Sequence, residues 1–157
     1  MTNDEFAERI VGMTQTLYRV SYAMLSQGAD REDAVQECLK KAWEKRGALR
    51  DERYLQTWVV RILINECHNI QRRARREAPT EAPPERPAPA GADRELHDAL
   101  LRLEARLRVP IVLYYMEGYS VREIARMLRL PQGTVKSRML KGRKALREML
   151  SEEVPEL

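Results

Sequence analysis

Basic and small polar side chains gather near the carboxyl end of the sequence, at the spacing of one face of a helix. On that face lie Lys136, Ser137, Lys141, Lys144 and Arg147, with Thr134, Arg138 and Arg143 close to it. Lys and Arg bind phosphate oxygens, and those near the start of a helix can also donate hydrogen bonds to base edges. The chemistry that this pattern predicts is recognition of duplex DNA. The alternative is an ordinary solvated basic surface.

The segments around this face have the order expected of a helix-turn-helix. Ser120 and Glu123 have the spacing of a capping box, which starts the first helix. A tight turn at 130–133 precedes a second helix over about 134–150, which carries the basic face. Arg129 stands where such turns often contain glycine, so we expect either a mildly strained left-handed residue or a different turn.

A proline-rich segment divides the chain. Residues 78–92 hold most of the prolines and almost no large apolar residue, which predicts a semi-rigid, solvated linker. It separates an N-terminal unit of about 1–77 from a C-terminal unit of about 93–157, in which Pro110 is expected to open a helix and Gly118 to close it. Both units show helical periodicity and neither shows strand alternation. The predicted fold class is therefore all-α, with two small helical domains joined by a Pro-rich linker.

The first helix boundaries of the N-terminal unit follow from its apolar stripe and its caps. Thr2 and Glu5 have capping-box spacing, and an apolar stripe over 6–24 predicts one continuous helix that Gly28 ends. Asp30 is the expected N-cap of the next helix.

Arginines close the third predicted helix, which begins near Glu52. They are Arg72, Arg73, Arg75 and Arg76. Cations suit the carboxyl end of a helix, but this number exceeds what capping requires. We interpret the cluster as a clamp on DNA phosphates.

Composition narrows the class of protein. The net charge of the 157 residues is only +4, so its distribution matters more than its size. Cys38 and Cys67 have no metal-ligand spacing with His68 or His97, so we expect buried free thiols and neither a metal, another cofactor nor a small-molecule substrate. The polar N-terminus lacks a signal-peptide pattern, and no apolar run could span a bilayer. We expect a cytoplasmic protein without membrane insertion.

Three longer strings resemble a known family. EGYSVREIARMLRLPQGTVKSRMLKGRKALREML resembles region 4 of the extracytoplasmic-function subfamily of bacterial sigma-70-type RNA polymerase sigma factors. DREDAVQECLKKAWEK resembles the region 2 helix that docks on the polymerase clamp, and TWVVRILINECHNIQRRARR resembles the promoter-melting helix that follows it. The strings follow one another in the order of the family, and the two regions that they identify, joined by the linker, cover nearly the whole chain. The two-domain architecture fits this subfamily, because larger sigma factors carry a further domain between these regions.

The resemblance implies roles for individual residues. The implied minus-35 contacts of region 4 are Ser120, Thr134, Lys136, Ser137, Arg138, Lys141 and Lys144. The implied minus-10 contacts of region 2 are Arg50, Arg53, Tyr54, Arg61, Asn65, Arg72, Arg73, Arg75 and Arg76. The implied polymerase contacts are Asp30, Asp33, Gln36, Glu37 and Lys40. For the polymerase contacts the alternative is simple capping and solvation, and for Trp58 a core role is favoured over base stacking.

The same resemblance implies a non-enzymatic transcription initiation factor. Its partners would be core RNA polymerase, promoter DNA and an anti-sigma factor. A stand-alone helix-turn-helix regulator is the alternative, but it explains only about 120–150 and leaves the two N-terminal strings unexplained.

Overall fold

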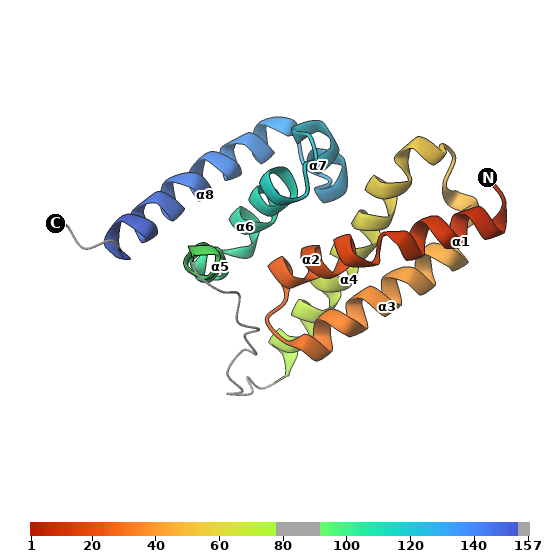
Figure 1. Ribbon diagram of the computed structural model, residues 1–157, viewed down its shortest axis with the longest axis horizontal. Helices are drawn as coiled ribbons and strands as arrows, with labels where there is room; N and C mark the ends of the chain where they lie inside the picture. Colours follow the sequence, from red (N-terminus) through yellow and green to blue (C-terminus); the bar gives the residue numbers. More distant parts are fainter. Residues whose placement is uncertain (78–91, 154–157) are drawn as a thin grey trace.

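The computed structural model describes residues 1–77 and 92–153, and this part of the chain is helical, with no strand. In chain order the elements are α1 (Asn3–Gly12), α2 (Thr14–Met24), α3 (Gly28–Glu44), η1 (Arg46–Ala48), η2 (Glu52–Tyr54), α4 (Leu55–Arg76), α5 (Ala92–Arg102), α6 (Ala105–Ile111), η3 (Val112–Met116), α7 (Val121–Leu128) and α8 (Gln132–Glu153) (Figure 1). The predicted all-α fold class is confirmed. The predicted linker at 78–92 lies outside the described residues except for Ala92.

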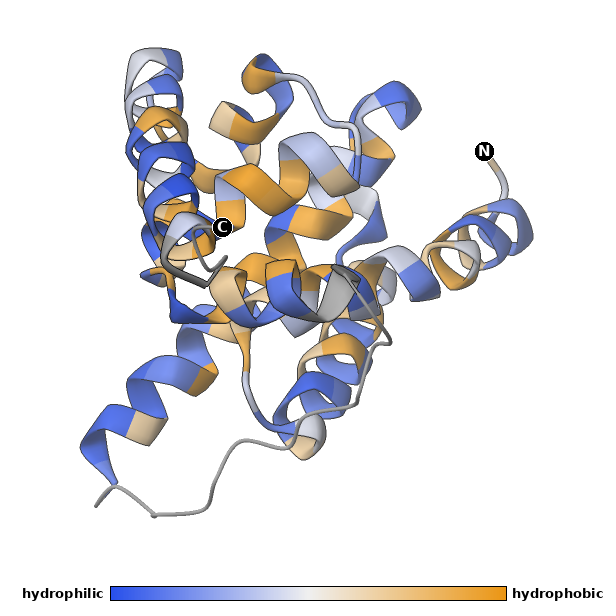
Figure 2. Cartoon of the chain, turned by 60° about the vertical axis from the view of Figure 1, so that its left-hand side comes forward, coloured by the Kyte–Doolittle hydropathy of each residue, from blue (hydrophilic) through white to orange (hydrophobic). Residues whose placement is uncertain are grey.

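In the N-terminal half, α2 and α3 pack against α4, and α1 packs against α2 and α3. α3 lies along α4, and α2 contacts both of them. Their facing sides bury large apolar side chains completely, among them Leu17, Val35, Val59 and Leu63. Figure 2 shows the apolar residues concentrated where the helices face one another. Removal of this apolar surface from water, at about 25 cal/mol per Å², is the main force that holds the four helices together.

The stripe over 6–24 is buried as predicted, but the prediction of one continuous helix was wrong. The helix stops at Gly12 and a second one starts at Thr14, with Met13 between them. Glycine costs about 1 kcal/mol relative to alanine inside a helix. The Thr14 hydroxyl also donates to the Val11 carbonyl at 2.6 Å, so the local side chain competes for a helix acceptor. Met13 stays buried, which carries the apolar stripe across the break.

The prediction that Gly28 ends a helix and that Asp30 caps the next one was also wrong. α3 begins at Gly28, its N-cap is Gln27, and no side chain makes a capping hydrogen bond there. Asp30 lies in the first turn, where the positive end of the helix dipole favours a carboxylate. The preceding helix, α2, ends at Met24 without a glycine cap. The carbonyl of the next residue, Leu25, accepts a hydrogen bond from the Arg31 guanidinium at 3.2 Å.

Pro110 does not open a helix as predicted but lies inside α6. The helix starts earlier because Glu104 is its N-cap, and the Glu104 carbonyl accepts the first intrahelical hydrogen bonds at 3.0 Å. After the proline the chain continues as the π-helical η3. Gly118 closes this segment as predicted, with φ of 76°, while the Tyr119 N–H donates to the Leu113 carbonyl at 3.0 Å.

A glycine allows α8 to approach α6 closely. A Cβ atom at Gly142 would collide with the Ile111 side chain and come within 3.3 Å of the Leu107 carbonyl oxygen. No other residue fits this contact without a shift of its neighbours. The contact holds one side of α8 against α6 and leaves its opposite side to solvent.

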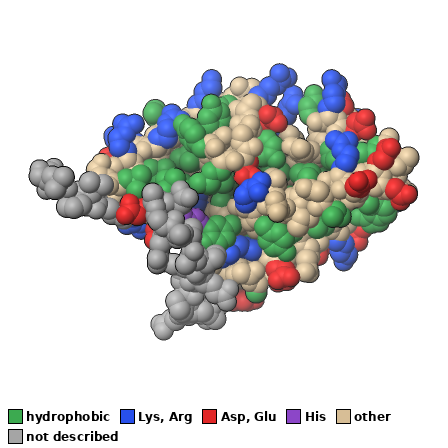
Figure 3. Space-filling view, in the orientation of Figure 1, with side chains coloured by type: hydrophobic (Ala, Val, Ile, Leu, Met, Phe, Trp, Pro, Cys, Tyr) green, Lys and Arg blue, Asp and Glu red, His purple; other side chains and the backbone are tan. Residues whose placement is uncertain are grey.

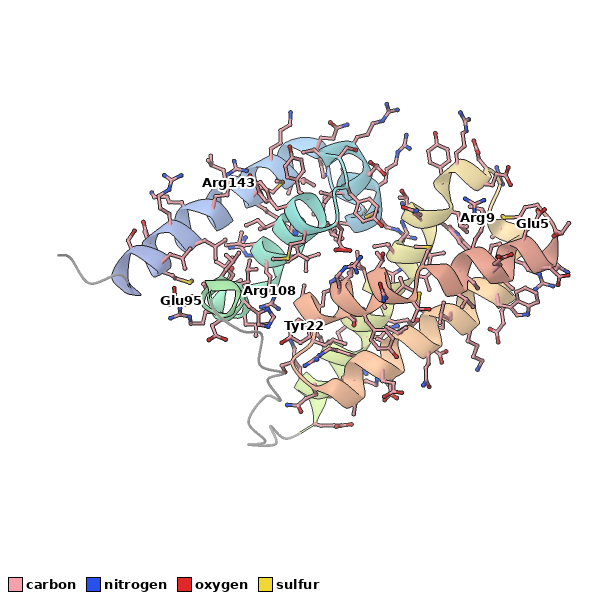
Figure 4. All side chains as sticks on the ribbon, in the orientation of Figure 1. Glu5, Arg9, Tyr22, Glu95, Arg108 and Arg143 are labelled. Atoms are coloured by element: carbon pink, nitrogen blue, oxygen red, sulfur yellow. The ribbon has the colours of Figure 1, made fainter. Side chains whose placement is uncertain are left out.

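The two halves of the described structure are in contact. α4 packs against α7, and α2 packs against α6 and η3. Arg108 lies at this junction, close to α2 and Tyr22 (Figure 4). It is buried, and its guanidinium donates to the Ala23 carbonyl at the end of α2 and to the Leu101 carbonyl at 3.1 Å. Burial lowers the pKa of Arg108, and the carbonyls at the two helix ends offset part of its lost hydration.

Candidate nucleic-acid and polymerase interface

The predicted DNA-binding face of α8 is open to solvent. Val135 and Met139 are buried against the other helices of this half. Of the predicted contacts, Lys136, Ser137, Lys141 and Lys144 are exposed, and Thr134 and Arg138 are half-buried. Figure 3 shows Lys and Arg side chains along the upper edge of the molecule, whose left and middle parts in Figure 1 are α8 and α7. The arrangement exposes cations on one side of α8, while the opposite side of α8 is packed against the other helices of this half.

The turn before α8 has the predicted helix-turn-helix geometry. The Ser120 hydroxyl accepts the Glu123 N–H, and the Glu123 carboxylate accepts the Ser120 N–H, both at 3.1 Å. Arg129 is left-handed, with φ of 56°, and the Leu130 N–H donates to the Ala125 carbonyl at 2.9 Å. The chain therefore makes this turn without glycine, at the cost of a strained arginine.

In the first half, three predicted minus-10 residues come together around a hollow between the 46–53 loop and the start of α4. Arg50, Tyr54 and Arg61 line the hollow. Trp58, for which a core role was favoured, is half-buried and also lines it, with its ring edge-on to Phe6 at a centroid distance of 6.2 Å. Arg126 of α7 and the Asp51 carboxylate complete the polar part of the lining. Two aromatic rings and three arginines in one hollow can bind a flat, anionic ligand such as a nucleotide.

Two other predicted minus-10 residues do not line the hollow. Arg53 is exposed and binds the Asp51 carboxylate at 2.8 Å. This contact lowers the pKa of the Asp51 carboxyl and raises the pKa of Arg53. Asn65 is exposed one turn beyond Arg61 on α4.

A second concave surface lies between α3 and the end of α4. The predicted polymerase residues Asp33, Gln36 and Glu37 line this groove. So do the predicted DNA-clamp residues Arg72, Arg73 and Arg76. The structure thus brings residues predicted for two different partners onto one surface. The predicted residues Asp30, Lys40 and Arg75 do not line it.

The groove contains an ion pair that the sequence reasoning missed. Glu66 is buried and accepts a hydrogen bond from the Lys41 ammonium group. This hydrogen bond is the main cause that raises the pKa of Lys41. The signal was present in the sequence, because Glu66 falls between Leu63 and Ile70 on the buried stripe of α4. A charged residue at such a position needs a partner.

Three arginine contacts between the two halves were also missed. Arg19 binds Glu117 at 2.9 Å, and Arg61 donates to the Arg126 carbonyl at 3.1 Å from its Nε. The third is the contact of Arg108 with the end of α2. Arg108 could have been singled out, because it interrupts an apolar run. The contact of Arg61 could not, because a backbone carbonyl as acceptor leaves no trace in the residue pattern.

Cys38 and Cys67 are buried free thiols, as predicted. Burial raises the pKa of each thiol to about 12, and the Cys38 thiol lies 3.5 Å from the Val59 carbonyl. Across residues 1–77 and 92–153, no group of three metal-ligating side chains comes together. Within these residues no helix is long and apolar enough to cross a membrane.

Comparisons with known proteins agree with this architecture. The family model of sigma-70 region 2 matches residues 13–77, and that of sigma-70 region 4 matches residues 93–146. The ECF RNA polymerase sigma factor SigM of Mycobacterium tuberculosis is 34% identical over 142 residues, which cover 85% of this chain and 71% of that protein. SigW of Bacillus subtilis is 28% identical, over 94% of this chain and 89% of that protein.

A solved structure shares the arrangement of both halves. The sigma factor RpoE of Bartonella quintana, in complex with the anti-sigma factor NepR, superposes with a TM-score of 0.81 at 27% identity. The superposition covers 96% of this chain and 99% of that chain.

Two helical regions in this order, matched by these two family models, define a sigma factor of the sigma-70 type. The chain belongs to the extracytoplasmic-function (ECF) family of these factors. It is a transcription initiation factor that binds core RNA polymerase and directs it to promoter DNA. The alternative of a stand-alone regulator is not favoured, because the region 2 match accounts for the half that such a regulator would lack.

Proposed function

We propose that the C-terminal region, about 93–157, recognises the minus-35 element through the exposed face of α8. The proposed contacts are Ser120, Thr134, Lys136, Ser137, Arg138, Lys141 and Lys144. The observation that carries this assignment is that α8 is packed on one side only, with Val135 and Met139 buried and the lysines on the opposite side exposed. A helix held in this way can enter the major groove without rearrangement.

The N-terminal region, about 1–77, captures a base of the minus-10 element in the hollow at the start of α4. Flipping a base costs a few kcal/mol, and least where the strands are already opening. Stacking on Tyr54 and Trp58 offsets this cost, and Arg50 and Arg61 neutralise the flanking phosphates. Arg53 and Asn65 act beside the hollow.

The α3–α4 groove binds core RNA polymerase through Asp33, Gln36 and Glu37, with Asp30 and Lys40 beside it. The arginine cluster 72–76 lies at the edge of this groove and clamps promoter phosphates as the DNA leaves the polymerase-bound region. The 78–92 segment links the two promoter contacts, so that modest affinities at two sites combine through effective concentration.

An anti-sigma factor is a further proposed partner. A TM-score of 0.81 over 96% of the chain requires both regions to superpose together, so their arrangement is close to that of RpoE in its NepR complex. We infer that this chain presents a similar composite surface to an inhibitor of its own. We infer that this sigma factor acts in the cytoplasm, where core polymerase and promoters meet.

In vitro transcription tests the whole assignment. The chain is mixed with bacterial core RNA polymerase and a pool of genomic fragments, and the start sites are mapped. We expect the starts to share one motif near minus-10 and another near minus-35. The exposed Arg106→Ala variant serves as a control outside the proposed DNA surfaces. Failure to bind core polymerase would refute the proposed polymerase contacts. Starts without a shared minus-35 motif would refute the proposed role of α8.

A further inference from the structure

The 46–53 loop lies between two hollows. On one side is the hollow assigned to the minus-10 base, where Leu49 and Arg50 are among the lining residues. The same two residues also line a second hollow behind the loop, together with Asn3 and Phe6 of α1. Contacts that hold the loop in place relative to α1 therefore also determine the shape of the minus-10 hollow.

The loop has little regular structure of its own to fix its position. It contains η1 and η2, which are single turns of 3-10 helix, and Leu49 between them is extended. Turns of this kind have poorer hydrogen-bond geometry than an α-helix. The position of the loop therefore depends on its contacts with neighbouring elements.

Arg46, the first residue of the loop, joins it to α1. Its Nη1 donates to the Trp43 carbonyl at 2.8 Å, and its Cζ lies 4.0 Å from the centroid of the Trp43 ring. These two contacts cap the end of α3, as arginines commonly do near the carboxyl end of a helix. The Arg46 Nε donates to the Asn3 Oδ1 at 3.1 Å, a contact that the capping of α3 does not require. This hydrogen bond ties the start of the loop to the start of α1.

The capping box of α1 fixes the place of Asn3. The Thr2 hydroxyl accepts the Glu5 N–H at 3.1 Å, and the Glu5 carboxylate accepts the Thr2 N–H at 2.9 Å. Asn3 is the first residue of the helix that these hydrogen bonds start. The acceptor for Arg46 is therefore positioned by α1 and not by the loop.

Phe6, one turn further along α1, contacts a ring of the minus-10 hollow. Phe6 is buried, and its ring centroid lies 6.2 Å from the centroids of both Trp43 and Trp58. Aromatic rings attract one another at this separation. Because Trp58 lines the minus-10 hollow, α1 contacts this site at two points, the start of the loop and the Trp58 ring.

We propose that α1 is a positioning element for the minus-10 hollow, in which Asn3 holds the 46–53 loop through Arg46 and Phe6 holds the ring of Trp58. Asn3 and Phe6 do not line this hollow, so they act only through the residues that they contact. The proposal rests on the proposed minus-10 role of the hollow. Selection among bases requires the surrounding groups to be held in place, whereas attraction to phosphates requires only charge. Loss of the α1 contacts should therefore lower base selectivity.

The test measures base selectivity in the holoenzyme, on a promoter mapped as above. Selectivity is the ratio of initiation with the preferred base to initiation with a substituted base, at the minus-10 position where the parent factor discriminates most. Asn3→Ala removes the acceptor of the Arg46 Nε. Arg46→Lys keeps the positive charge, but an ammonium group cannot reproduce the contacts of the planar guanidinium. We expect each variant to lower the ratio about fivefold, because one hydrogen bond is lost.

Three further variants show whether this hydrogen bond is the cause. The double variant Asn3→Ala with Arg46→Lys should lower the ratio no further than either single variant, because both changes remove the same contact. Asn3→Asp should keep the parent ratio, because its carboxylate also accepts from Arg46. Glu8→Ala is the matched control, since Glu8 is an exposed residue of α1 that does not line the hollow behind the loop.

A merely structural role of these residues would give a different pattern. Loss of the fold would lower initiation at every promoter alike and weaken binding to core polymerase, whereas the proposal expects unchanged core binding and an unchanged minus-35 preference. A parent ratio in either Asn3→Ala or Arg46→Lys, or additive losses in the double variant, would overturn the proposal.

Phe6→Leu tests the second contact of α1. It keeps an apolar side chain but removes the ring beside Trp58, and it should lower the ratio as Asn3→Ala does. Circular dichroism checks that the variant keeps its helices, and the two hydrogen-bond variants decide the outcome if it does not. A parent ratio in a folded Phe6→Leu variant would show that Phe6 has no positioning role.

A parallel measurement with Tyr54→Ala separates this proposal from the proposed function. If Tyr54→Ala kept the parent ratio, the assignment of the minus-10 site would fail. If Tyr54→Ala lowered the ratio while Asn3→Ala and Arg46→Lys did not, only the positioning role of α1 would fail.

Discussion

The two proposed DNA-binding surfaces of this sigma factor differ in how they are built and in how accessible they are. The minus-35 surface lies on α8, with Ser120 at the start of α7 beside it, and the α8 lysines are open to solvent. The minus-10 surface combines the 46–53 loop with the start of α4, and Arg126 of α7 covers part of it. A surface on one helix depends only on helical periodicity and on one buried side. A surface assembled from several segments depends on packing, and packing can also hide it.

The largest expected effect comes from the minus-10 hollow. The double variant Tyr54→Ala with Arg61→Ala removes a stacking partner, worth about 1–3 kcal/mol per base, and a phosphate contact. We expect open-complex formation by the holoenzyme to fall on the order of a hundredfold, measured by permanganate footprinting of the melted strand.

The matched control for this prediction keeps the ring and the charge. Tyr54→Phe with Arg61→Lys should retain most of the activity, because a phenyl ring stacks on a base and an ammonium group binds a phosphate. An equal loss in both double variants would show that the residues support the fold of the loop and do not contact DNA.

The α8 face should show a smaller effect with a different signature. Lys136→Ala or Lys141→Ala should lose about 1–3 kcal/mol of discrimination among base pairs, because one donor to a base edge is removed. Competitive transcription from a set of minus-35 variants measures this preference. The Arg106→Ala control should keep the parent preference. An unchanged ranking in the lysine variants would remove them from the recognition surface and weaken the contrast between the two sites.

The arginine cluster at the end of α4 should act through charge alone. Replacing Arg72, Arg73 and Arg76 by Gln should lower the slope of log affinity against log salt by about 0.9 for each phosphate that the variant no longer neutralises. Titration of duplex promoter DNA at several salt concentrations measures the slope, with Arg9→Gln on α1 as a control. An unchanged slope with weaker binding of core polymerase would assign the cluster to the polymerase surface, since it lines the same groove as Glu37.

The two surfaces also differ in how far they could be predicted from the sequence. The solvent exposure of the α8 lysines, the Ser120 capping box and the buried stripe of α1 and α2 were predicted correctly, because each follows from local spacing. The break at Met13 was not predicted. The apolar stripe continues through it, and it is marked only by Gly12 and by a hydroxyl-to-carbonyl contact of Thr14.

The local spacing of residues could not predict contacts between segments that lie far apart in the chain. Tyr54 and Arg61 were expected near DNA, but nothing in their neighbourhood indicated that α7 would cover them. Arg61 and Arg108 both bind backbone carbonyls across the junction of the two halves. Every residue has a carbonyl, so such a contact requires no complementary side chain. Only the packing of the two halves decides which carbonyl is reached.

The smallest expected effect tests the turn that joins the two surfaces. Arg129 lies between α7, which covers the minus-10 hollow, and α8, and its left-handed backbone disfavours any side chain. Arg129→Gly should raise the free energy of unfolding by about 1 kcal/mol, because glycine adopts this conformation without steric cost. Chemical denaturation measures the gain, and Arg122→Gly, at an exposed position inside α7, should instead lose about 1 kcal/mol.

The same variant also has a consequence for the hollow. Burial is the main cause that lowers the pKa of Arg61, and the charge of Arg129 lowers it further. Removal of Arg129 therefore relieves a repulsion on Arg61 and should strengthen the hydrogen bonds from the Arg61 guanidinium to the Arg126 carbonyl, which join α4 to α7. We expect Arg129→Gly to bind single-stranded minus-10 DNA slightly more weakly as a free chain, with an unchanged minus-35 preference in the holoenzyme. Tighter binding would show that the turn opens the junction when its strain is relieved.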